Sequence, residues 1–123
     1  AESADGWQDN PAIQLLEQAC ALEPRPTELL KLAKLLLRNP LWTNRALSCM
    51  RRAIEVDPQF VDAWLELAEF WRRRNHAERQ RKALERALAV DPDNERANQL
   101  YRQLAGKREL DRLLRRARES RSR

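Results

Sequence analysis

The chain has 123 residues, a net charge of +5 and a hydrophobic fraction of 42%, with only two glycines. This length allows one compact domain or a short repeat array, and no apolar run approaches the ~18 residues that a membrane span needs. Leucine, alanine, glutamate, arginine and glutamine dominate, and these strong helix formers predict an all-α fold.

The predicted elements begin with a polar lead over residues 1–9 and a first helix over 11–22. Asn10 is the expected N-cap of this helix, and Pro11 suits its first turn. Two helix pairs are predicted next, 27–38 with 43–56 and 61–74 with 77–90. Helices over 95–105 and 107–119 follow, and 120–123 is a short basic tail. The side chains of Asp93 and Asn94 are expected to cap the helix that starts at residue 95.

The last predicted helix is amphipathic, with an apolar face and arginines on the other side. The apolar face consists of Leu110, Leu113, Leu114 and Ala117. A terminal element of a repeat array needs a polar outer face for solubility, and this helix suits that position. Residues 107–123 also carry eight basic and three acidic residues, which accounts for the whole positive excess of the chain.

An internal repeat is visible in three acid-proline pairs that stand 34 residues apart, at Glu23-Pro24, Asp57-Pro58 and Asp91-Pro92. Residues 45–60 and 79–94 align without gaps, and six of their sixteen positions are identical. Two further positions recur in all three copies: a small residue at Ala19, Ala53 and Ala87, and a larger apolar one at Leu16, Met50 and Leu84. The small residues predict close helix approach, and proline predicts the end of each second helix.

A 34-residue helix pair that ends in proline resembles the tetratricopeptide repeat. Residues 61–94 match its pattern at Trp64, Leu67, Ala68, Trp71, Leu84, Ala87 and Pro92, and depart from it at Gln80. Residues 27–60 match at Leu30, Ala33, Leu37, Ala46, Met50, Ala53 and Pro58, with Lys34 where a small residue is expected. The stretch from Asn39-Pro40 through Trp42 to Asp57-Pro58 also resembles, more weakly, the repeat regions that trail J domains in bacterial chaperone-associated proteins, although no J-domain motif is present.

The resemblance covers residues 11–105 and implies antiparallel helix pairs stacked in a short right-handed superhelix, a TPR-like α-solenoid. It divides the domain at 11–119 into a half unit over 11–26, repeats over 27–60 and 61–94, and a final unit with a capping helix over 95–119. Because the first helix lacks a mate of its own, an apolar flank is expected to be open. We therefore expect a monomer or a weak homodimer.

The family resemblance further implies a non-catalytic scaffold that binds another protein through the concave face of its first helices. The residues at the groove-lining positions are Glu28, Lys31, Leu35, Arg38, Asp62, Leu65, Glu69, Arg72, Arg96, Gln99 and Gln103. Leu35 and Leu65 are the expected apolar anchors, although such positions can equally be ordinary solvated helix faces. Capture of a partner's C-terminal carboxylate is not expected, because Glu66 has the wrong charge for that clamp.

Other functions find less support in the sequence. No catalytic, cofactor or metal site is expected, because His76 is the only histidine and falls in a turn, and Cys20 and Cys49 lack metal-ligand spacing. These cysteines are expected to be reduced in a cytoplasmic protein. The alternative function is binding of nucleic acid or an acidic surface through the basic C-terminal helix and tail, or through the cluster at Arg72, Arg73, Arg74, Arg79, Arg81 and Lys82. No aromatic residue in the tail can stack on bases, so nucleic acid is the less favoured partner.

The four tryptophans are assigned by their positions in the pattern. Trp64 and Trp71 occupy core positions of a repeat, and packing explains them. Trp42 falls in a turn, where partial exposure is expected. Trp7 precedes the first helix and is expected to pack on its start or to touch a partner.

Overall fold

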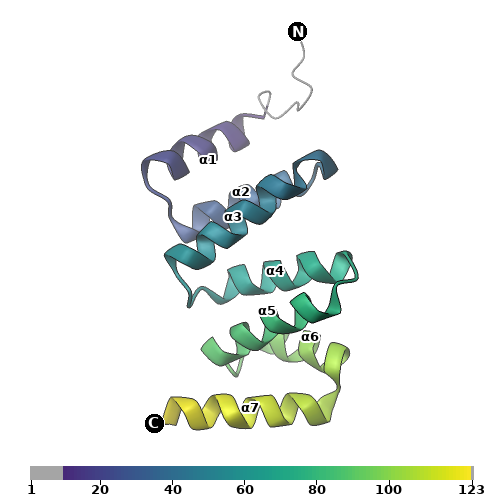
Figure 1. Cartoon of the computed structure of the whole chain (residues 1–123). Helices are drawn as coiled ribbons and strands as arrows, with labels where there is room; N and C mark the ends of the chain where they lie inside the picture. The colour runs from purple at the N-terminus through teal and green to yellow at the C-terminus, as the bar shows by residue number, and fades with distance from the viewer. Residues whose placement is uncertain (1–9, 123) are drawn as a thin grey trace. The chain divides into compact units, whose positions relative to one another are not determined.

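The computed structural model describes residues 10–122, which form an all-α fold (Figure 1). No strand occurs in this range. Its elements are α1 (Pro11–Leu22), α2 (Pro26–Leu36), a 3-10 helix η2 (Pro40–Trp42), α3 (Thr43–Val56), α4 (Val61–Arg73), α5 (Ala77–Val90), α6 (Glu95–Ala105) and α7 (Lys107–Ser122). The expected all-α succession of helices is confirmed. The expectation for Trp7 lies outside the described residues.

Local capping explains where α1 and α6 begin. The Asn10 side chain accepts hydrogen bonds from the backbone N–H groups of Ala12 and Ile13, at 3.0 and 3.3 Å. Asn94 accepts one in the same way from Ala97, at 2.9 Å. These bonds satisfy donors that the first turn of a helix otherwise leaves without a partner.

The turn between α2 and α3 corrects one expectation. Trp42 is buried, with 8% of its surface exposed, whereas its turn position had suggested partial exposure. The side chain of Asn39 accepts a hydrogen bond from the Leu41 N–H at 2.9 Å and so caps η2. This tight turn directs Leu41 outward, at 76% exposed, and buries the next residue along the chain. Helical turns in short connections are hard to foresee from sequence because only about three residues define them.

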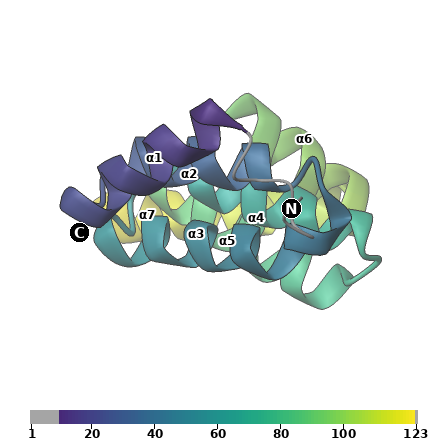
Figure 2. The same cartoon turned by 90° about the horizontal axis from the view of Figure 1, so that it is seen from above.

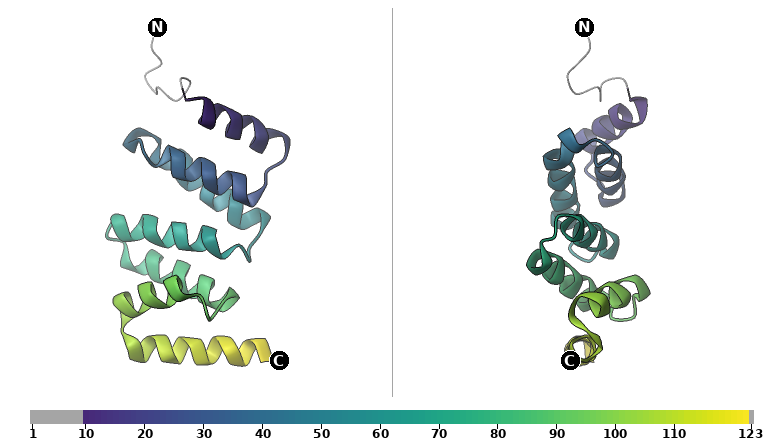
Figure 3. Two further views of the ribbon diagram at one scale, coloured as in Figure 1. Left: turned by 180° about the vertical axis from the view of Figure 1, so that it is seen from behind. Right: turned by 90° about the vertical axis from the view of Figure 1, so that its right-hand side faces the viewer.

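The chain divides into two compact units between Ala63 and Trp64, and each unit is described by itself. In unit 1, α2 packs against both α1 and α3. Figures 1 and 3 show α2 and α3 side by side, with α1 at the N-terminal end of the unit. The buried side chains of this unit include Ile13, Cys20, Leu29, Leu30, Leu32, Ala33, Leu36, Ala46, Met50 and Ala53.

Unit 2 contains α5, α6, α7 and nearly all of α4. The helix α5 packs against α6 and α7, and α6 also packs against α7. The antiparallel pairing of α4 with α5 is visible in two arginine stacks: Arg79 lies over the Trp71 ring at 4.7 Å, and Arg86 lies over the Trp64 ring at 5.4 Å. The buried side chains include Ala68, Phe70, Trp71, Ala83, Leu84, Ala87, Leu88, Ala97, Tyr101 and Leu110. Figure 2 views the helices from above.

The C-terminal helix is held to the turn between α5 and α6. Arg118 forms an ion pair with Asp93 at 3.0 Å, and the Arg121 guanidinium donates to the carbonyl of Val90 at the end of α5. Cations are favourable at a helix C-terminus, where carbonyl groups lack partners. The helix α7 therefore extends to Ser122, three residues beyond its expected end.

The turn between α4 and α5 is a Schellman motif centred on Asn75. The His76 N–H donates to the Trp71 carbonyl at 2.9 Å, and the Asn75 N–H donates to the Arg72 carbonyl at 3.0 Å. Asn75 has φ 57°, the left-handed conformation that this motif requires. Asparagine and glycine tolerate this conformation, whereas β-branched residues do not.

We expect Asn75→Val to lower the free energy of unfolding by about 1–2 kcal/mol, because valine is strained at a positive φ. Asn75→Gly should be neutral or stabilising by up to about 1 kcal/mol. Urea titrations followed by circular dichroism measure both variants. Equal stability of the valine and glycine variants would contradict the conformational explanation.

Candidate partner-binding surface

In unit 1 the expected surface residues lie along α2 and just beyond it. Lys31 and Arg38 are exposed, and Leu35 is half-buried. Because α2 ends at Leu36, Arg38 belongs to the turn that follows, in which its N–H donates to the Leu35 carbonyl at 3.2 Å. Lys31 and Leu35 are spaced by four and share one face of α2, and Arg38 follows in the turn, so unit 1 offers an apolar side chain with one cation before it and one after it along the chain.

In unit 2 the α4 residues of the expected surface differ in accessibility. Leu65 and Glu69 are each 7% exposed, whereas Arg72 is exposed. Little of the Leu65 side chain is therefore available to a partner, although it was expected to be an apolar anchor. Asp62, which belongs to unit 1, is exposed in the first turn of α4, where a carboxylate interacts favourably with the helix dipole.

Glu69 is the centre of an ion-pair cluster that joins α4 to α6. The Arg72 guanidinium approaches its carboxylate with Nε at 3.2 Å from Oε1 and Nη2 at 3.0 Å from Oε2. Arg96 on α6 contributes a third cationic contact, with Nη2 at 3.9 Å from Oε1. A two-pronged arginine–carboxylate contact fixes the orientation of the guanidinium plane as well as its position.

The electrostatic consequence is a lowered pKa for Glu69. The hydrogen bond from Arg72 is the main cause, and the positive charges of Arg72 and Arg96 add to it, although burial acts in the opposite direction. The carboxylate therefore stays ionised and holds both arginines. One negative charge between two positive charges leaves this cluster with a net charge of +1.

The remaining expected residues lie next to this cluster on α6. Arg96, Gln99 and Gln103 are all exposed, and their spacing of three and four places them along one face. The Arg96 side chain is 61% exposed, so most of it can reach a partner despite the contact with Glu69. The α6 side of the surface is thus a strip of guanidinium and amide groups.

Several arginines of the chain pack on aromatic rings or pair with carboxylates within unit 2. In the cluster around the α4–α5 turn, Arg74 covers the Phe70 ring at 4.8 Å and Arg79 covers Trp71. Arg81 lies near both Glu85 and Glu109, at 3.7 Å from each. A cation over an aromatic face is attracted by the ring quadrupole and shields apolar surface from water. These arginines form one basic cluster in the sequence, but their contacts in the structure differ, and the sequence does not indicate those contacts.

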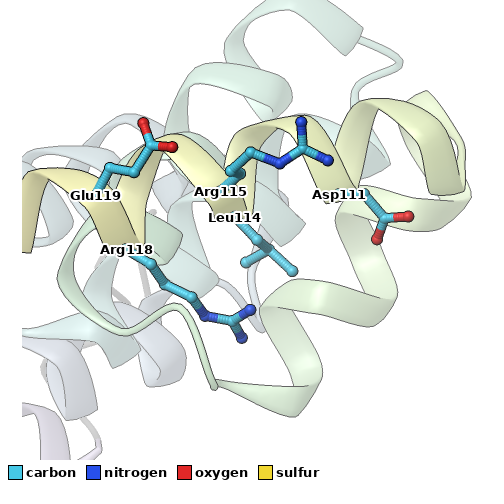
Figure 4. A pocket seen from close by; sticks show the side chains of 5 residues that line it. All are labelled: Asp111, Leu114, Arg115, Arg118 and Glu119. Carbon is cyan, nitrogen blue, oxygen red and sulfur yellow. The ribbon is translucent and has the colours of Figure 1, made fainter.

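A pocket of about 430 Å³ lies along one flank of α7 (Figure 4). Its lining consists of Asp111, Leu114, Arg115, Arg118 and Glu119. Two acidic and two basic side chains surround a single leucine, so their formal charges cancel. An adjacent hollow of about 420 Å³ is also lined by both signs of charge, at Asp91, Asp93, Arg118 and Arg121 with Pro92. No pattern in the sequence indicates either hollow.

Three features of residues 10–122 concern metal binding, histidine chemistry and membrane insertion. No group of histidine, cysteine or acidic side chains in this range is arranged to hold a metal ion. His76 is exposed, and its ring lies 5.4 Å from that of Trp71. None of the described helices combines the length and apolar character needed to cross a membrane.

The Glu69 cluster should make stability depend on pH. A carboxyl group with a lowered pKa in the folded state stabilises the protein above its unfolded pKa of about 4.3, and this stabilisation is lost as the pH falls through the folded pKa. We expect Glu69→Gln to lower the free energy of unfolding at pH 7 by about 1 kcal/mol, because the half-exposed arginine screens the interaction. The difference from the wild-type protein should shrink between about pH 5 and pH 3. Urea titrations across this range measure it, and a constant difference would contradict the assignment.

Helix pairs with a 34-residue period define the class of protein as an α-helical repeat protein. The family model described as tetratricopeptide repeat matches residues 43–104, which is half of the chain and covers α3 to the end of α6. The chain belongs to the tetratricopeptide repeat family. No curated protein and no solved structure matches it. Repeats of this family generally mediate protein–protein interactions.

Proposed function

We propose that this chain is a non-catalytic module that binds another protein through the first helices of its repeats. Each unit would contribute a surface of its own: Lys31, Leu35, Arg38 and Asp62 in unit 1, and Arg72, Arg96, Gln99 and Gln103, supported by Leu65 and Glu69, in unit 2. Membership of the family supports a protein as the partner. The observation that carries the choice of surface is the pair of exposed arginines held by the buried carboxylate of Glu69.

The chemistry of the unit 2 surface indicates which partner groups it can bind. The Arg72 and Arg96 guanidinium groups are donors, and the amides of Gln99 and Gln103 both donate and accept. Groups that are already held in position lose less conformational entropy on binding. Backbone carbonyls and acidic side chains of an extended segment or a folded surface are therefore the expected targets.

We expect Gln99→Glu with Gln103→Glu to reduce partner capture by at least tenfold, because two new carboxylates would repel acidic groups and reject carbonyls. These substitutions leave the Glu69 cluster intact. The assay is quantitative affinity capture from a lysate of the source organism, followed by mass spectrometry. Lys82→Glu is the matched control, because Lys82 is exposed on α5, a second helix.

A loss of capture is informative only if the variant is still folded. Thermal melting of each variant establishes whether it is. Loss of the same proteins with the Gln99 and Gln103 variant, and their retention with the Lys82 control, is the expected result. If both variants capture the wild-type set of proteins in equal amounts, the binding site lies elsewhere.

The proposal extends to assembly and location. We infer a monomer or weak homodimer, which sedimentation equilibrium measures directly. Cys20 and Cys49 are free thiols, and burial raises the pKa of the Cys49 thiol to about 11, so it is protonated and unreactive at neutral pH. Free thiols are typical of a reducing compartment, which supports a cytoplasmic location.

A further inference from the structure

The first helix has a row of apolar residues that the described part of the chain leaves open. This row consists of Ala12, Leu15, Leu16, Ala19 and Leu22, all on one face of α1. Leu15 is 66% exposed and Leu22 is 89% exposed. The adjoining side of α1 is buried, with Ile13 and Cys20 at 1% and 3% exposed. The open row is thus a second apolar face on a helix that already packs on α2 through its first.

The internal repeat shows what covers the same row elsewhere in the molecule. The residues 34 positions later are Ala46, Cys49, Met50, Ala53 and Val56 on α3, and those 68 positions later are Gln80, Ala83, Leu84, Ala87 and Val90 on α5. Met50, Ala53, Leu84 and Ala87 are fully buried, at 0% exposed, whereas Val56, at the position of Leu22, is 49% exposed at the end of the row. On α3 the paired first helix provides the cover, because α2 packs on α3. In the next repeat, the stacks of Arg79 on Trp71 and of Arg86 on Trp64 align α4 antiparallel to α5.

We propose that α1 binds an amphipathic helix of a partner protein, which takes the place on α1 that α2 takes on α3. The occupant is a helix with large apolar residues spaced by three and four around a small residue. The chain's own first helices have this pattern, with Leu30, Ala33 and Leu37 around α2 and Trp64, Ala68 and Trp71 on α4. Docking of an amphipathic helix into an apolar groove is a common mode of recognition.

One further observation defines where the partner helix would lie. First helices of consecutive repeats are neighbours, as the contact between Arg96 of α6 and Glu69 of α4 demonstrates in unit 2. A first-type helix on α1 would therefore also lie beside α2, and the two helices together form its groove.

A second copy of this chain fits the row less well. The apolar faces of its α2 and α5 are already buried within its own units. The open flank of its α7 is charged at Asp111, Arg115, Arg118 and Glu119 (Figure 4), so it cannot cover Leu15 and Leu22 without burying charge. Contact between two α1 helices alone would be far smaller than the ~800 Å² per partner of a stable interface.

The test uses a fluorescein-labelled peptide with the sequence of residues 27–38, TELLKLAKLLLR, which has the required pattern. Fluorescence anisotropy measures its binding to the full chain. We expect saturable binding that is at least tenfold weaker for the variant Leu15→Asp with Leu22→Asp. Leu41→Asp is the matched control, since Leu41 is 76% exposed on η2, and it should change the affinity less than twofold. NMR shifts of the labelled protein should centre on α1.

Four outcomes would overturn the proposal. The first is an absence of peptide binding up to millimolar concentration, and the second is an equal loss of peptide affinity in the Leu41→Asp control. The third is a dimer of the wild-type chain that dissociates when Leu15 and Leu22 are replaced by aspartate. The fourth is peptide binding that is at least tenfold tighter with Trp7→Ala. The third would identify a second copy as the occupant, and the fourth would identify the chain's own residues 1–9. Circular dichroism confirms folding, which substitutions at such exposed positions should preserve. The Gln99 and Gln103 variant should bind the peptide normally, so failure here is distinguishable from failure of the first-helix surface.

Discussion

Replacement of Leu84 by alanine is expected to lower the free energy of unfolding by about 2–5 kcal/mol. Leu84 is 0% exposed on α5, which packs against α6 and α7 and pairs with α4 through arginine stacks. The substitution removes buried methyl groups and leaves a cavity that the packed helices can fill only partly. Denaturant titration followed by circular dichroism and by tryptophan fluorescence measures the change.

The repeat provides an internal control for this result. Leu16 stands at the equivalent position 68 residues earlier, but it is only half-buried on α1. Leu16→Ala should therefore cost about 1 kcal/mol or less, because less apolar surface is lost and no closed cavity forms. A cost for Leu16→Ala equal to that for Leu84→Ala would show that the row on α1 is covered in solution.

Replacement of Ala87 by leucine is expected to lower the free energy of unfolding by about 1–3 kcal/mol. Ala87 is fully buried and lies three residues after Leu84 on the same face. A leucine there inserts three additional carbon atoms where helices approach closely, and either rotamers or helix positions must shift. Thermal melting measures the loss.

The matched substitution is Ala19→Leu on α1, where the equivalent alanine is exposed. It should change the free energy of unfolding by less than about 0.5 kcal/mol, as surface substitutions generally do. In a partner complex of the proposed kind, however, Ala19→Leu should weaken peptide binding, because the approach of the incoming helix would be obstructed. Equal destabilisation by both substitutions in the free protein would contradict the difference in packing.

Most helix boundaries could be predicted from the sequence because they depend on local chemistry. Asn10 and Asn94 cap the helices that follow them, and the predicted starts at residues 11 and 95 agree with the structure. The predicted ends at residues 22, 56 and 90 also agree, each next to an acid-proline pair. The burial of Trp42 was missed because a three-residue helix leaves too little pattern to recognise.

The candidate surface could be predicted only in outline. Its residues were placed by the repeat pattern, and the spacing of Glu69 and Arg72 is the usual one for an ion pair within a helix. The participation of Arg96 depends on the approach of α6 to α4, and the low exposure of Leu65 depends on tertiary packing. Residue spacing along a single helix predicts neither the contact of Arg96 with Glu69 nor the burial of Leu65. The same limit applies to Arg118 and Arg121, whose contacts lie 25 and 31 residues away along the chain.

The sequence by itself determined the family, the period of 34 residues and the order of the helices, because caps, proline and apolar spacing act over a few neighbouring residues. Tertiary structure alone decided which copy of each repeated residue is covered. Ala19, Ala53 and Ala87 are equivalent in sequence, yet only the latter two are buried. The physical reason is that burial depends on whether a paired helix lies against that face, and in the described chain α3 and α5 have such a partner whereas α1 does not.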